Sequence, residues 1–67
     1  MPYKQINDLP DSVKNHLPHH AQEIFRAAFN SASEEYGEEE RAFRVAWAAV
    51  KRDYKKGEDG NWHKKPE

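Results

Sequence analysis

The stretch PHHAQEIFRAAFNSASEEYG, residues 18–37, carries the clearest periodic pattern in this chain. Pro18 suits the first turn of a helix, where its missing N–H removes no hydrogen bond, and Gly37 suits the left-handed residue that ends one. Between them, apolar side chains recur at helical spacing while the opposite face is polar. These apolar residues are Ala21, Ile24, Phe25, Ala28, Phe29, Ala32 and Tyr36. The pattern therefore predicts a helix over residues 18–36.

A second amphipathic segment follows after a very short connection. Three consecutive glutamates open it, where carboxylates favour the positive end of a helix, and Gly57 follows a cationic last turn. These signals predict a helix over residues 38–56. The short connection makes the two helices an antiparallel pair, and their small residues allow close approach. The large side chains expected between them are Phe25, Phe29, Phe43 and Trp47.

A shorter helix is predicted before this pair. Leu9, Val13 and Leu17 lie four residues apart, and Pro18 must end the helix that carries them, so we expect a helix over residues 9–16. A chain of 67 residues can enclose one core but not two. The sequence thus predicts a mainly α, three-helix fold and a single domain over residues 1–67.

Two aromatic residues stand apart in polar segments near the two ends of the chain. Tyr3 and Trp62 each stand among mostly polar residues, and we expect the two ends to meet as a small two-stranded β-ribbon that buries them. Asp53 falls on the apolar side of the last helix, and a half-buried carboxylate needs hydrogen-bond donors. We therefore expect the Asp53 carboxylate to accept hydrogen bonds from a terminal segment and to hold the ends together.

Composition limits the classes of function. The chain has no cysteine, which excludes disulfides, thiolate metal ligands and thiol nucleophiles. It shows neither an export signal nor a run of apolar residues long enough to span a bilayer, so we expect a soluble, cytoplasmic monomer. A net charge of −1 differs from the basic excess of a typical nucleic-acid binder.

Neither catalysis nor metal binding is indicated. The serines lack a Gly-flanked elbow, and the histidines lack an acidic partner at H-E-x-x-H spacing. Five glutamates, which could gather a hard cation, do not alternate as in a calcium loop, so helix-dipole stabilisation explains them better. They are Glu34, Glu35, Glu38, Glu39 and Glu40. We expect no enzyme activity, no metal site and no cofactor.

Several segments together resemble the ChaB family over nearly the whole chain. They are Leu9-Pro10 through Val13, Leu17-Pro18 with His20-Ala21-Gln22, Ala28-Phe29-Asn30, Val45-Ala46-Trp47 with Ala49-Val50-Lys51, and Trp62-His63-Lys64-Lys65. The resemblance implies a helical fold with a small terminal sheet. Family members are called cation transport regulators because their gene lies beside that of a calcium/sodium–proton antiporter, so a regulator of a cation antiporter is implied.

The same resemblance implies an alternative and shows one departure. ChaB-like domains occur in insect viruses and joined to modules similar to an RNA-binding terminator domain, which makes nucleic-acid binding the second interpretation. The connection at Tyr36-Gly37 is shorter than in members from enteric bacteria, which carry a charged insertion there. A function that depends on the insertion would be absent from this chain.

Basic residues of the last predicted helix form the candidate partner surface. Spacings of three and four place four of them on one outward ridge, with Arg52 beside it; the set is Arg41, Arg44, Lys51, Arg52 and Lys55. The ridge could contact an acidic protein segment, lipid headgroups or nucleic-acid phosphates. It could equally be an ordinary solvated helix face. We favour a noncatalytic interaction domain that presents this ridge, together with the acidic loop between the two long helices, to a protein partner.

Overall fold

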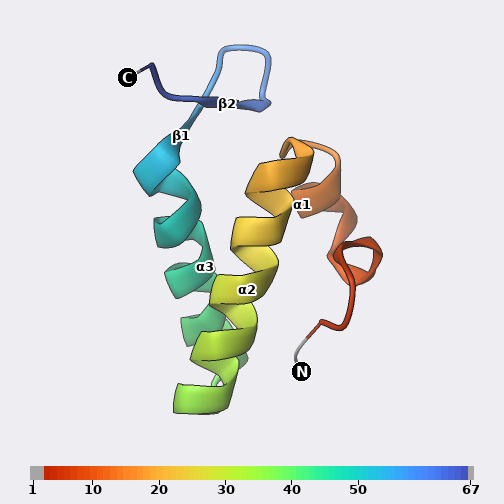
Figure 1. The fold of residues 1–67 in the computed structure, drawn as a ribbon, viewed down its shortest axis with the longest axis vertical. Coiled ribbons are helices and arrows are strands. Elements are labelled where there is room, and N and C mark those ends of the chain that lie inside the picture. The colour runs from red at the N-terminus through yellow and green to blue at the C-terminus, as the bar shows by residue number, and fades with distance from the viewer. Residues whose placement is uncertain (1–2, 67) are drawn as a thin grey trace.

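The computed structural model describes residues 3–66, and its body is an antiparallel pair of helices. Helix α2 (His19–Tyr36) and helix α3 (Glu39–Asp53) lie side by side along the long axis of the molecule (Figure 1). A β-hairpin projects at the end of α3, and a short N-terminal segment with helix α1 packs beside α2. The predicted mainly helical fold with a small two-stranded sheet is confirmed.

Aromatic rings fill the contact between α2 and α3. Phe25 and Phe29 are fully buried, and the Phe43 ring stands 4.8 Å from that of Phe29 at a steep angle. Trp47 meets the Phe25 ring edge-on at 5.0 Å. Alanines and one valine of the two helices, all nearly inaccessible, let the axes approach; they are Ala21, Ala32, Ala42, Ala46 and Val50. Four large rings in one layer therefore form the centre of the core.

Helix α2 agrees with its sequence signals at both ends. Pro18 precedes its first residue in an extended conformation, so the proline introduces the helix without interrupting its hydrogen bonds. At the other end Gly37 takes a φ of 69°, in the left-handed region, and donates its N–H to the Ser33 carbonyl at 2.9 Å. That turn lets α3 run back antiparallel to α2.

The first helix is shorter than predicted. A 3₁₀ turn, η1 (Ile6–Asp8), is followed by α1 (Asp11–Lys14), in place of one helix over residues 9–16. Pro10 explains the difference, because the residue before a proline avoids the helical region, and Leu9 is extended with ψ of 151°. The three apolar side chains that indicated the helix are nevertheless buried in the core; they are Leu9, Val13 and Leu17.

The prediction for the C-terminal part of the last helix is wrong. Helix α3 ends at Asp53, and Tyr54 turns to an extended conformation with φ of −130°. Strand β1 (Tyr54–Lys56) then pairs antiparallel with strand β2 (Trp62–Lys64), with Tyr54 opposite Lys64. The cause is burial of the Tyr54 side chain, which is 4% exposed, together with the pairing of β1 with β2. The ribbon thus joins two C-terminal strands, and the predicted pairing of the two termini is wrong.

Tyr3 packs far from Trp62, against the side of α2. Its ring lies 4.8 Å from that of Phe29, and its main chain exchanges two hydrogen bonds of 2.7 Å with the Asn30 side-chain amide. Burial raises the pKa of Tyr3, and the negative charge of Glu39 adds to the increase. Tyr3 therefore fixes the N-terminal segment to α2 without help from the C-terminus.

Asp53 also differs from its prediction. Its side chain is exposed, whereas its main-chain carbonyl accepts the Lys65 N–H at 2.8 Å. The last carbonyls of a helix have no partner within the helix, so the tail supplies one. Asp53 thus holds the C-terminal segment through its backbone rather than through its carboxylate.

Candidate functional site: a basic groove over two tryptophans

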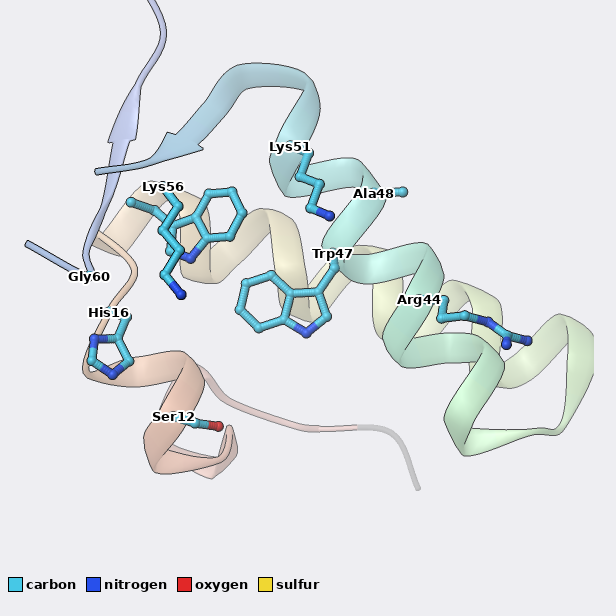
Figure 2. A pocket seen from close by; sticks show the side chains of 9 residues that line it. Ser12, His16, Arg44, Trp47, Ala48, Lys51, Lys56 and Gly60 are labelled. Carbon is cyan, nitrogen blue, oxygen red and sulfur yellow. The ribbon is translucent and has the colours of Figure 1, made fainter. Parts of the chain in front are cut away.

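An open groove of about 680 Å³ runs along the seam between α1, α3 and the hairpin (Figure 2). All three parts of the chain contribute side chains to it. The lining residues are Ser12, His16, Arg44, Trp47, Ala48, Lys51, Lys56, Gly60 and Trp62. We call this hollow the tryptophan groove. It is the candidate site because it combines apolar surface with several charges of one sign.

Two indole rings form the apolar part of the groove. The rings of Trp47 and Trp62 are stacked, with centroids 5.5 Å apart and an angle of 29° between their planes. Both are half-buried, so each keeps some surface toward solvent. On the side that faces the core, the Trp47 ring makes an edge-on contact with the Phe25 ring at 5.0 Å. The floor of the groove is therefore attached directly to the core.

Backbone hydrogen bonds hold Trp62 in place. The Trp62 N–H donates to the His16 carbonyl at 2.8 Å, which ties β2 to the loop after α1. Beside it, the His16 imidazole Nδ1 lies 3.2 Å from the Asn61 side-chain oxygen. On the other side of the hairpin, the His20 imidazole Nδ1 lies 3.1 Å from the Tyr54 hydroxyl. These contacts attach the hairpin to the helices and form this side of the groove.

The hairpin turn has its own polar lock. The Asp59 carboxylate accepts the Asn61 N–H at 3.0 Å and lies 3.2 Å from Nε2 of His63. The hydrogen bond from Asn61, followed by that from His63, lowers the pKa of Asp59 below its ordinary value of 3.8. A side chain at Gly57 would stand only 2.7 Å from the His63 ring. A side chain at this position would therefore displace the His63 ring and weaken its contact with Asp59.

The charges around the groove are all positive. Arg44 and Lys51 come from α3 and Lys56 from β1, and all three side chains are exposed. Among the residues that the structure describes, no aspartate or glutamate belongs to the lining. Within residues 3–66 none of the three cations takes part in an ion pair. The groove therefore presents an apolar surface bordered by cations that form no ion pair with any residue from 3 to 66.

The structure distributes the five predicted basic residues among different surroundings. Arg44 and Lys51 line the groove as one face of α3. Arg41 lies over the Tyr36 ring at 4.1 Å, near the acidic end of the helical pair. Arg52 lines a separate hollow of about 400 Å³ with Lys64 and Lys65, among others. Lys55 lies on β1 and is not part of the groove.

Sequence reasoning does not predict Ser12, His16, Lys56 or Gly60 as part of a partner surface. The helical pattern places Lys56 in the last predicted helix, and the serines and histidines are considered only for catalysis or metal binding. The change from helix to strand after Asp53 places Lys56 on β1, and the chain reversal around Gly57 and Gly60 brings Trp62 back beside Trp47 of α3. Turn residues in that stretch are the only sequence signal for the reversal. Pairing across the hairpin, not helical spacing, assembles this part of the groove.

The geometry is that of a binding site. Within the described chain, residues 3–66, no hydrogen bond joins the Ser12 hydroxyl to an imidazole, and no group of three or more His, Asp or Glu residues could hold a metal ion. The described helices also include none with the length and apolar content needed to cross a bilayer. The groove can offer contact area, positive charge and hydrogen-bond donors.

Comparison with known proteins shows a close likeness over nearly the whole chain. The ChaB family model matches residues 9–65. The "Putative cation transport regulator ChaB" proteins of Escherichia coli K12 and Shigella flexneri are each 53% identical, covering 97% of this chain and 99% of the relative. The solution structure titled "NMR solution structure of the putative cation transport regulator ChaB" superimposes with a TM-score of 0.88 at 52% identity, covering 97% of this chain and all of that one.

The alignment also measures a length difference. It runs over 75 positions but includes only 97% of this 67-residue chain, so about ten positions of the relative have no counterpart here. This agrees with a shorter chain than the relatives have; the predicted place of the deletion, at Tyr36-Gly37, stays a prediction. The fold, the family model and the identity along nearly the full length lead to one conclusion: the chain belongs to the ChaB family.

Proposed function

We propose that this chain is a noncatalytic regulatory protein that acts by binding a protein partner in the tryptophan groove. The relatives are named as regulators of cation transport, and that name supports a regulatory role for this chain. A protein of this size can regulate another protein mainly by binding to it through its surface. The groove is the part of the described surface that combines large apolar side chains with charge.

One observation carries the proposal: the described part of the groove has three cations, two tryptophans and no carboxylate. Tryptophan and arginine are the residues that most often dominate the binding energy of protein interfaces. Unpaired cations beside them steer an acidic partner and orient it. A solvated helix face of no function needs neither the indole floor nor the absence of acidic residues.

The finer part of the proposal concerns the partner. We propose that the partner is a cation antiporter and that this chain binds an acidic cytoplasmic segment of it. We also propose that this chain acts as a cytoplasmic monomer. The test is co-purification of the two proteins from cells that express both. Arg44→Glu combined with Lys51→Glu should remove the antiporter from the purified fraction. Lys55→Glu, which reverses a charge outside the groove, should leave it; equal recovery with all variants would refute the groove as the binding site.

Nucleic-acid binding is the second candidate, because indole rings beside cations also suit single strands. A labelled single-stranded oligonucleotide, titrated at low salt and followed by fluorescence anisotropy, tests it. Binding that weakens steeply with salt and disappears in the Arg44→Glu, Lys51→Glu variant would favour this function over protein binding. No change in anisotropy at low salt would remove it.

A further inference from the structure

The distance between two cations of the groove indicates how far apart the negative groups of a ligand should be. Arg44 and Lys51 are seven residues apart on α3, which is two helical turns and about 10 Å along its axis. Both therefore extend from the same side of the helix, with Trp47 and Ala48 between them (Figure 2). A ligand that satisfies both cations needs two negative groups at a similar separation, with an apolar group between.

We infer that the tryptophan groove binds an amphipathic helix of a partner protein, through two acidic residues seven positions apart and one large apolar side chain between them. This inference rests on the proposed function and names the chemistry of its partner. On such a helix the two carboxylates lie about 10 Å apart on one face, opposite Arg44 and Lys51. The apolar side chain, three or four positions from each, lies over Trp47.

The neighbouring charges favour a short acidic segment over a long polyanion. Beyond Arg44, toward the start of α3, Glu39 and Glu40 lie in the first helical turn and Glu38 directly precedes it. A nucleic-acid strand that continued along α3 would meet these carboxylates and be repelled. A partner helix need carry negative charge only over the groove, and a basic residue one to two turns further would suit the glutamates.

The contacts between the aromatic rings also favour a protein partner over a nucleic acid. Trp47 is in contact with Phe25 on one side and with Trp62 on another. The two indoles are thus stacked on each other and leave no slot between them for a nucleobase. What remains open is a continuous apolar surface of the kind that accepts a leucine or phenylalanine side chain.

The test uses a synthetic helical peptide and the two tryptophans as reporters. The probe is an alanine- and glutamine-based peptide, acetylated and amidated, of about sixteen residues so that a helix can form. It carries two glutamates seven positions apart with leucine between them. The chain has two tryptophans, so its ¹H–¹⁵N spectrum contains two indole N–H signals, both from the groove. Saturable shifts of both signals are expected.

Matched controls separate the inference from nonspecific attraction. A peptide of identical composition with its glutamates five positions apart places them on different faces, and it should bind at least about tenfold more weakly. Arg44→Glu with Lys51→Glu should weaken the original peptide at least about tenfold, while Lys55→Glu should leave its affinity within about twofold. Circular dichroism of each variant checks that the helices are intact.

Several results would overturn the inference. Equal binding of the two peptides would refute the spacing, and absence of saturable shifts would refute the ligand class. Shifts produced by a single-stranded oligonucleotide but not by the peptide would assign the groove to nucleic acid. Indole shifts that grow with the concentration of the protein alone would mean that a second copy occupies the groove. Peptide binding without antiporter co-purification would leave the inference standing and refute only the proposed partner.

Discussion

The helical pair of α2 and α3 and the hairpin of β1 and β2 are stabilised in different ways. In the pair, Phe25 and Phe29 are fully buried and lie among the rings of a four-member aromatic layer. In the hairpin, Trp62 is half-buried, and the two strands are three residues each. A two-stranded hairpin is marginal in water without support, so this one depends on its contacts with the helices.

This difference matters for the groove, because its two walls belong to the two regions. Arg44 and Lys51 stand on α3, whose position is set by the core. Lys56 and Trp62 stand on the hairpin, which is held by a few hydrogen bonds and one ring stack. We infer that α3 supplies a preorganised surface and that the hairpin is the wall able to adjust to a partner.

The largest effect is expected for Phe25→Ala in the helical pair. Loss of a fully buried phenylalanine costs about 3–5 kcal/mol, which is comparable with the whole stability of a small domain. Urea denaturation followed by circular dichroism should show most of the helix lost even before urea is added. Tyr36→Ala is the control on the same helix: that ring is 42% exposed, so its loss should cost below about 1 kcal/mol.

A smaller and more local effect is expected for Trp62→Ala in the hairpin. The substitution removes the stack on Trp47, and the half-buried ring should contribute about 1–3 kcal/mol. Amide exchange should accelerate in β1 and β2 but much less in α2. Trp62→Phe, which keeps an aromatic ring, should restore most of the protection. Equal acceleration throughout the molecule would show that the hairpin and the helices unfold together.

The same two regions differ in how well the sequence predicts them. Helix α2 is eighteen residues long, so its apolar period is sampled over five turns and its ends carry proline and glycine signals. Strand β1 has only three residues, and Tyr54 continues the helical period of α3 by position alone. Its strand conformation is decided by tertiary contacts, the burial of the Tyr54 ring and pairing with Lys64, which no local pattern records.

The residues of the groove also differ in how well the sequence predicts their positions. Arg44 and Lys51 could be placed on one face from helical spacing, and Trp47 could be placed beside them at the helical contact. Trp62 arrives through the chain reversal, and its stacking on Trp47 of α3 is a contact between segments distant in sequence. Lys56 precedes that reversal and is placed by the change from helix to strand after Asp53. A ridge that was predicted to extend to Lys55 therefore ends at Lys51, and the next groove cation is Lys56 on a strand.

The same substitution, glycine to alanine, can be made in the turn between α2 and α3 and in the hairpin, and so compares the two regions. Gly37 and Gly60 have φ of 69° and 85°, and nothing lies within 4 Å of a side-chain carbon at either position. Alanine should therefore cost about 1 kcal/mol at each through backbone strain alone. Gly37→Ala should lower the urea midpoint of the helices, because the turn joins α2 to α3. Gly60→Ala should speed amide exchange in the hairpin and leave that midpoint nearly unchanged.

The smallest effect concerns the hairpin turn and its dependence on pH. The folded state lowers the pKa of Asp59, so this carboxylate adds stability above its ordinary pKa of 3.8, and the contribution is lost as pH falls through the lower folded value. The stability that the natural hairpin has over Asp59→Asn should be present at about pH 5, where the carboxylate is ionised, and should shrink as the pH falls below 3.8. The Trp62 indole signal, followed during acid titration of both proteins, measures it. Because Asp59 is exposed, the helices should not respond, and a matching loss of helix at the same pH would show that the turn contributes to the core after all.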